Sequence, residues 1–119
     1  MTTIFKSARP GPGVVLCRVD ELSDPGSKGF RFREGDSMFA GFVVRKAGKI
    51  MGYVDSCPHA GWPLGRIDGT FLTAEKDFIY CAGHGALFRP ENGLCVAGPG
   101  GGALLRWPVT VEGDLVVTA

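Results

Sequence analysis

Two cysteine–histidine motifs near the middle of the sequence constrain this chain more than any other feature. The first motif is CPH at residues 57–59, and the second is CAGH at residues 81–84. Together they contain both histidines of the chain and two of its four cysteines. Thiolates and imidazoles are ligands of zinc and of iron–sulfur centres. The chain is therefore expected to bring two separate loops to one metal centre. The predicted ligands are Cys57, His59, Cys81 and His84.

The chemistry of this ligand set allows two kinds of centre. Two thiolates and two imidazoles suit a tetrahedral zinc ion, or a [2Fe–2S] cluster in which two histidines replace two cysteines on one iron. Zinc fingers usually pair two cysteines in one motif and two histidines in the other. Here each motif supplies one cysteine and one histidine, which favours the iron–sulfur centre. A zinc-bearing interaction module is the alternative.

At these residues the sequence resembles the Rieske ferredoxin family. The signature of that family is Cys-x-His followed by Cys-x-x-His, with a glycine after the second histidine and an aromatic residue soon behind it. Gly85 and Phe88 match those last two features, and the GPG sequence at 98–100 matches a proline-containing loop beside the cluster. The resemblance implies that the two cysteines bind the inner iron and the two histidines the outer iron. It also places these residues around the cluster: Trp62, Gly83, Ala86, Phe88 and Pro99.

Four of these surrounding positions bear on the reduction potential. High-potential Rieske proteins have a disulfide between the two ligand loops, and a serine and a tyrosine that donate hydrogen bonds to the cluster sulfurs. Here Trp62 and Gly83 stand where the two cysteines would be. Ala86 replaces the serine and Phe88 replaces the tyrosine. Because hydrogen bonds to sulfur stabilise the more negative reduced cluster, their loss predicts a low potential.

The resemblance implies a one-electron carrier rather than an enzyme, because the site has no nucleophile, general base or open metal position. The expected partners are a flavin-containing reductase and the terminal oxygenase of a multicomponent oxygenase. Docking is expected at the cluster tip formed by His59, His84, Trp62 and Pro99, with modest electrostatic steering because net charge is near zero. A small subunit of another oxidoreductase, such as nitrite reductase, is the alternative function.

Length and charge exclude several other classes of protein. A chain of 119 residues is expected to form a single domain. The formal net charge is +1 and no Lys/Arg cluster marks a phosphate-binding face, so nucleic acid is not an expected partner. No signal peptide is apparent, and no apolar run approaches the roughly 18 residues of a membrane helix. We therefore expect a soluble, cytoplasmic protein that does not bind membranes.

Hydrophobic alternation predicts an all-β domain of about ten short antiparallel strands. The expected architecture is a Rieske-like sandwich or barrel base, with an extended arm over residues 1–13 and a cluster-binding subdomain inserted over 56–100. Cys17 and Cys95, outside the motifs, are expected to be free packed thiols, and Trp107 is expected to pack in the core. The predicted strands cover residues 14–19, 30–33, 39–45, 50–55, 78–80, 86–88, 104–111 and 115–118.

Overall fold

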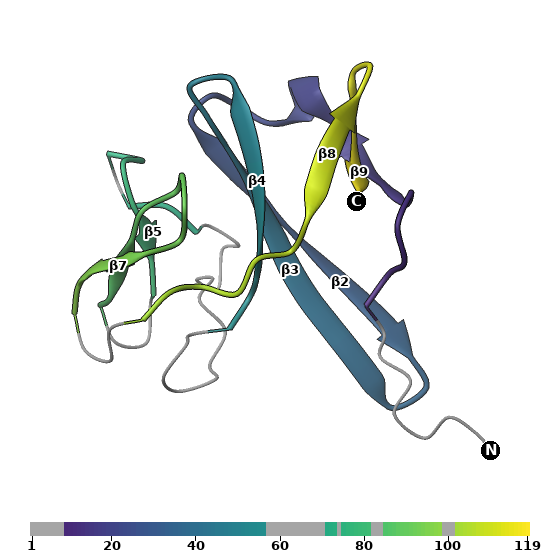
Figure 1. Ribbon diagram of the computed structural model, residues 1–119, viewed down its shortest axis with the longest axis horizontal. Helices are drawn as coiled ribbons and strands as arrows, with labels where there is room; N and C mark the ends of the chain where they lie inside the picture. The colour runs from purple at the N-terminus through teal and green to yellow at the C-terminus, as the bar shows by residue number, and fades with distance from the viewer. Residues whose placement is uncertain (1–8, 57–70, 74, 82–84, 99–101) are drawn as a thin grey trace.

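The computed structural model describes residues 9–56, 71–73, 75–81, 85–98 and 102–119 (Figure 1). Within them, the chain forms three antiparallel sheets: sheet A with order β1-β9-β8, sheet B with order β2-β3-β4, and sheet C with order β5-β6-β7. This confirms the all-β prediction. The strands are β1 (Val15–Arg18), β2 (Gly26–Glu34), β3 (Ser37–Lys46), β4 (Lys49–Val54), β5 (Ile79–Tyr80), β6 (Leu87–Phe88), β7 (Cys95–Ala97), β8 (Val109–Glu112) and β9 (Leu115–Thr118), with a 3-10 helix η1 at Val19–Glu21.

Sheet B is the central layer of the structure. Its strands form two consecutive hairpins, and β3 and β4 correspond to the strands predicted over 39–45 and 50–55. The turn between β3 and β4 places Ala47 and Gly48 at φ values of 53° and 78°. Such left-handed pairs match the natural twist of a hairpin. The carboxylate of Asp24 accepts hydrogen bonds from the backbone N–H groups of both turn residues, at 2.9 and 2.8 Å, which fixes this end of the sheet.

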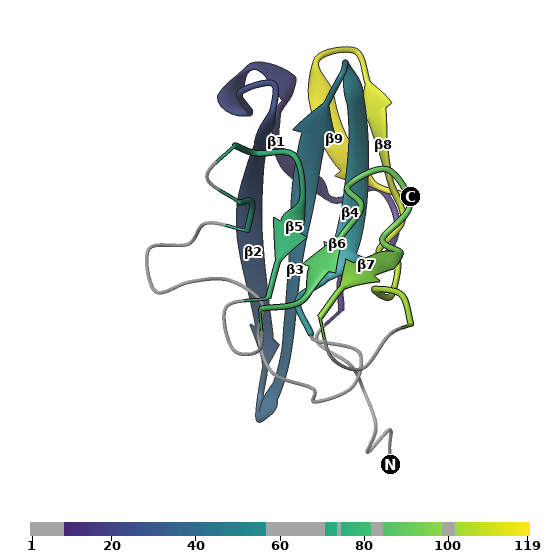
Figure 2. The same cartoon turned by 90° about the vertical axis from the view of Figure 1, so that its left-hand side faces the viewer.

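Sheet A packs against one face of sheet B, around a cluster of aromatic rings (Figures 1 and 2). Trp107 lies at the centre of this cluster with only 1% of its surface exposed. Its ring centroid lies 6.3, 6.2 and 5.2 Å from those of Phe30, Phe32 and Phe39, each pair in an edge-to-face arrangement. Edge-to-face pairs are favourable contacts for aromatic quadrupoles. The predicted core position of Trp107 is confirmed.

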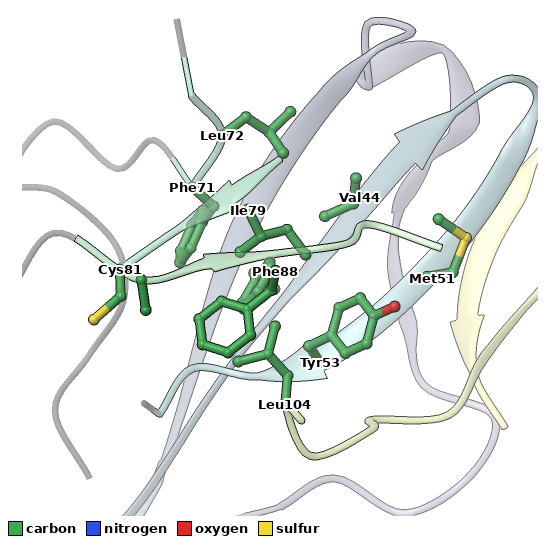
Figure 3. Close-up of a cluster of buried hydrophobic side chains, with 11 residues drawn as sticks. Val44, Met51, Tyr53, Phe71, Leu72, Ile79, Cys81, Phe88 and Leu104 are labelled. Atoms are coloured by element: carbon green, nitrogen blue, oxygen red, sulfur yellow. The ribbon is translucent and has the colours of Figure 1, made fainter. Parts of the chain in front are cut away.

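Sheet C packs against the opposite face of sheet B (Figure 2). The interface is a second apolar cluster, formed by side chains of β3 and β4 together with side chains of sheet C and its neighbouring loops (Figure 3). Phe42 of β3 and Phe71 stack with their centroids 4.3 Å apart and their planes nearly parallel. The strands β3 and β4 of sheet B are therefore buried on both faces along much of their length. The members of this cluster are Phe42, Val44, Met51, Tyr53, Phe71, Leu72, Ile79, Cys81, Ala86, Phe88 and Leu104.

Two strand predictions were wrong in extent. The sequence predicted a strand over 30–33, but β2 begins at Gly26 and ends at Glu34, because its backbone pairs with β3 along the whole strand. The sequence also predicted one strand over 104–111, but β8 begins only at Val109. Pro108 has no N–H to donate to a ladder. Before it, the backbone N–H of Trp107 bonds instead to the carbonyl of Gly52 in β4, at 2.9 Å.

Two further features departed from the simple alternation pattern. The strand β7 was not predicted, because its three residues are too few to show a period. In β1, alternation placed Val15 and Cys17 on one face, yet Val15 is exposed and Cys17 is buried. A register shift between these two residues explains the difference, since a β-bulge reverses the side-chain direction along a strand.

The first described residues are attached to the last strand. The N–H of Gly13 donates to the carbonyl of Thr118 at 2.7 Å, and the Thr118 hydroxyl donates to the carbonyl of Gly11. The arm predicted over residues 1–13 begins outside the described residues, and its extended form stays a prediction. The described residues contain no helix long and apolar enough to cross a membrane.

Candidate metal centre

The first ligand motif follows β4 directly. This strand ends at Val54, and the N–H of Asp55 then donates to the carbonyl of Ala40 in β3 at 3.0 Å. The N–H of Ser56 donates to the carbonyl of Val54 at 2.9 Å, which turns the chain immediately before Cys57. The motif therefore begins from a paired strand end, as the sequence predicted.

The second motif follows β5 in the same way, and Cys81 is the ligand candidate that the structure describes. Its backbone N–H donates to the carbonyl of Ala86 at 2.9 Å, while its own carbonyl accepts from Gly85 at 2.8 Å. These two bonds tie the backbone of Cys81 to Gly85 and Ala86. Gly85 has a φ of 72°, which favours glycine at this position.

The Cys81 side chain is suited to bind a metal centre. The residue is fully buried, with 0% of its surface exposed. In Figure 3, its sulfur points away from the rings of Phe71 and Phe88. A buried thiol at the end of a short strand, within a loop closed by backbone bonds, fits the role of a thiolate ligand to a cluster.

Ala86 and Phe88 lie directly after this loop and are both buried. Neither side chain has a hydrogen-bond donor, so neither can donate to a cluster sulfur. Gly98, in the downstream segment, approaches Ala86 closely. A Cβ atom at Gly98 would lie 2.5 Å from the Ala86 Cα, and the φ of Gly98 is 98°. The segment before Pro99 is therefore packed against the second ligand loop.

Six of the predicted site residues lie outside the described residues: Cys57, His59, Trp62, Gly83, His84 and Pro99. Their roles stay predictions. The structure does bring Cys81, Ala86 and Phe88 together, on sheet C and the loop between β5 and β6.

The structure also identifies two supporting residues that sequence reasoning did not assign. Gly98 fits against the second ligand loop, as described above. The buried hydroxyl of Tyr53 donates to the carbonyl of Pro90 at 2.7 Å, which connects β4 to the turn before β7. Burial raises the pKa of Tyr53 to about 12. The family resemblance had placed the GPG sequence at 98–100 beside the cluster but gave no contact for Gly98, and no sequence signal existed for Tyr53.

The two cysteines outside the motifs are free thiols, as predicted. Cys17 is buried between sheets A and B, where burial raises the pKa of its thiol. Cys95 is partly buried in β7, with its sulfur 3.3 Å from the carbonyl oxygen of Ala97. Both therefore have local packing roles within the β structure.

Comparison with known proteins agrees with this site. The sequence model of the Rieske [2Fe-2S] domain matches residues 13–108. A ferredoxin from Sphingomonas yanoikuyae B1 has a similar structure, with a TM-score of 0.63 and 25% identity, covering 88% of this chain and 95% of that one. The ferredoxin of carbazole 1,9a-dioxygenase from Nocardioides aromaticivorans IC177 gives a TM-score of 0.66 and 24% identity, covering 92% and 98% of the two chains.

A larger protein also contains this fold. The terminal oxygenase of carbazole 1,9a-dioxygenase from Novosphingobium sp. KA1 matches with a TM-score of 0.67 and 23% identity, covering 94% of this chain but 30% of the oxygenase. No curated protein sequence matched. Because the family match covers most of the chain, this protein belongs to the Rieske [2Fe-2S] domain family. Its cofactor is accordingly a [2Fe–2S] cluster of the Rieske type.

Proposed function

We propose that this protein is a one-electron carrier that passes electrons from a flavin-containing reductase to a terminal oxygenase. Cys57, His59, Cys81 and His84 hold the cluster, which supplies the one-electron chemistry when bound. The buried, loop-closed position of Cys81 is the observation on which this proposal depends most. The chain's own contribution is to fix that ligand at a strand end, and to surround it with apolar side chains that exclude water.

The similar structures support a carrier role, because this chain covers 95% and 98% of two ferredoxins and 30% of the similar terminal oxygenase. One similar structure is a complex of reduced oxygenase and oxidised ferredoxin in carbazole 1,9a-dioxygenase. We propose the same kind of partnership for this chain, with docking at the tip that contains His59, His84, Trp62 and Pro99.

The division of the chain and its location complete this proposal. We propose that residues 1–119 form one Rieske domain, in which 56–100 is the cluster-binding subdomain on a β base, and that the protein acts in the cytoplasm. The alternative is a small subunit of another oxidoreductase, such as nitrite reductase. In that case the reduced protein would support the reduction of nitrite and not the oxygenation of an organic substrate.

The test of the cofactor and its ligands is spectroscopic. Protein purified without oxygen should be brown, contain two irons per chain, and give the low-average-g EPR signal of a His-ligated cluster after reduction with dithionite. His84→Ala should abolish that signal, because one iron loses its imidazole. A colourless protein with one tightly bound zinc would instead support the zinc-module alternative and contradict this proposal.

The test of the carrier role uses purified partners. A flavin-containing ferredoxin reductase with NADH should reduce the protein, and a terminal oxygenase encoded near it should then reoxidise it in one-electron steps. Omission of this protein should stop product formation by the oxygenase. If the oxygenase turns over equally well without it, the carrier role is wrong even where the EPR signal is present.

A further inference from the structure

The hairpin formed by β2 and β3 extends beyond the end of β4. Val54, the last residue of β4, pairs with Gly41 of β3, so residues 37–40 and their partners in β2 continue past it. At about 3.4 Å per residue, this extension is about 14 Å long. β4 is antiparallel to β3 and therefore runs toward the closed end of the hairpin. The projecting hairpin, visible in Figures 1 and 2, thus lies at the end of the molecule where β4 leads into the first ligand motif.

One face of this extension is basic and apolar. In the hairpin register, Arg31 pairs with Ala40 and Arg33 pairs with Met38. Two paired residues have their side chains on the same face of the sheet, and so does every second residue along a strand. Met38 and Ala40 therefore share a face with Phe42, which sheet C covers, and their partners Arg33 and Arg31 lie on that face as well. Both arginines are exposed, and Met38 has 56% of its surface exposed. We call Arg31, Arg33 and Met38 the hairpin patch.

The two arginines of the patch differ from other cations of the protein. Arg18, Lys28 and Arg45 form ion pairs with carboxylates, whereas Arg31 and Arg33 form none within the described residues. A guanidinium without a carboxylate partner retains its five donors for a planar anion on another molecule.

The acidic groups nearby do not neutralise this face. Glu34 pairs with Ser37 at the end of the hairpin, one residue out of phase with Arg33, so it belongs to the opposite face. Asp36 lies in the turn. Among the described residues, Asp55 is the one carboxylate that borders the patch, since its N–H donates to the carbonyl of Ala40, which pairs with Arg31. Within that part of the chain, two arginines against one carboxylate give this end of the face a net positive charge.

We propose that the hairpin patch is a docking surface for an acidic, partly apolar face of a protein redox partner. This inference rests on the proposed function, because it assigns part of the docking contact of the same carrier. Arginine and methionine are enriched in protein interfaces, and carboxylates pair with arginine in a bidentate geometry. A contact built on these three residues is small, and small interfaces are typical of the transient complexes that transfer electrons. Membrane or nucleic-acid surfaces are usually bound by larger clusters of cations.

This docking surface changes the expected response to salt. The net charge of +1 by itself predicts weak steering. A local positive patch at the end of the molecule where β4 ends instead steers an acidic surface into one orientation, and added salt screens that attraction. Association should therefore depend on ionic strength more steeply than the net charge suggests.

The test uses the cluster-loaded protein and a gold electrode coated with a carboxylate-terminated alkanethiol, which represents an acidic partner surface. The variant Arg31→Gln/Arg33→Gln removes the patch charges. The control Lys49→Gln/Lys76→Gln removes the same charge from two exposed positions near the opposite end of sheet B. Lys49 begins β4, and Lys76 precedes Asp77, whose carbonyl accepts a hydrogen bond from Lys46 at the end of β3. Visible and circular dichroism spectra of all three proteins should agree, which shows that the fold and the cluster are retained.

The electron-transfer rate on this electrode should fall at least about tenfold in the arginine variant at low ionic strength, and far less in the lysine control. The difference should vanish when salt shortens the Debye length from about 30 Å to about 3 Å. Equal rates in the two variants would overturn the docking proposal while leaving the proposed function intact. Loss of the EPR signal in the wild-type protein would instead overturn the function.

A second measurement separates a protein partner from a lipid surface. Sedimentation with vesicles of mixed phosphatidylcholine and phosphatidylserine should show no more binding by the wild-type protein than by the arginine variant. Vesicle binding that disappears in the arginine variant and persists in the lysine control would assign the patch to anionic membranes and overturn the proposal of a protein partner.

Discussion

The base, made of sheets A and B, and the sheet C region are held together in different ways. In the base, β2 and β3 are nine and ten residues long and pair along their whole length. In sheet C, the strands have two, two and three residues. The base also has its own aromatic core around Trp107, whereas the apolar core of sheet C is shared with sheet B.

This difference indicates that the two regions depend on the cofactor to different degrees. Long ladders and a separate core allow the base to fold without the cofactor. Sheet C has few ladder bonds of its own, so its order depends on its contact with sheet B and on the ligand loops that it connects. Regions with few independent contacts open most easily, and metal binding contributes folding free energy where ligands come from such regions.

Removing a cluster ligand should show the largest difference between the base and the sheet C region. Cys81→Ser should abolish the visible spectrum of the cluster. Hydrogen exchange should then accelerate at amides of β5 and β6, while amides of β2 and β3 stay protected. Cys95→Ser is the matched control in sheet C and should retain both the spectrum and the exchange pattern. Equal acceleration in the base and in sheet C would show that the two regions do not differ in their dependence on the cluster.

The base should depend on its own aromatic core. Trp107→Ala removes the ring at the centre of three edge-to-face contacts, and should lower the free energy of unfolding by about 3–5 kcal/mol. Chemical denaturation measures this loss. The exposed Met38→Ala should change the same quantity by no more than about 0.5 kcal/mol. A loss below about 1 kcal/mol for Trp107→Ala would contradict the role of this cluster as the core of the base.

The approach of Gly98 to Ala86 should matter to the sheet C region alone. In Gly98→Ala, the new methyl group would meet the backbone of Ala86, so the second ligand loop must shift. We expect a loss of about 1–3 kcal/mol and a lower cluster content, measured by iron analysis. Gly102→Ala is the control, because Gly102 also has a positive φ, of 82°, but has open space around it. Equal cluster content in the two variants would assign the effect to backbone strain rather than to contact with the loop.

Tyr53 connects the two regions through one buried hydrogen bond. Tyr53→Phe leaves the buried carbonyl of Pro90 without its donor, at a cost of about 1–3 kcal/mol. Burial raises the pKa of this phenol from 10.0 to about 12, so the folded state retains the proton that the unfolded state loses. Stability should therefore fall as the pH rises from 10 toward 12. Tyr53→Phe should flatten that fall, because the raised pKa belongs to this phenol. Denaturation curves over this pH range provide the measurement.

The sequence predicted the base better than the sheet C region. Alternation over β3, β4 and β9 is long enough to define strands, and the turn at 46–49 identified a hairpin. The same method failed at β7, whose three residues show no period, and at 104–108, where the backbone bonds to β4 and to Gly93 instead of forming a strand.

Site prediction depended on motif spacing rather than on periodicity. The position of Cys81 at a strand end agrees with the prediction, because a ligand motif followed a short apolar run. The contact of Gly98 with Ala86 could not be predicted, since it depends on how two distant loops pack. The hairpin patch was also missed, because the net charge of the whole chain conceals a local concentration of arginine.

The central claim is that this chain is a low-potential one-electron carrier, and its midpoint potential at pH 7 tests that claim most directly. Ala86 and Phe88 are both buried and lack the donors that would stabilise the reduced cluster. Protein-film voltammetry should therefore give a one-electron wave below zero, near the lower end of the family's range of roughly −150 to +300 mV. A midpoint well above zero, or the absence of a one-electron wave from protein that contains two irons per chain, would contradict the account.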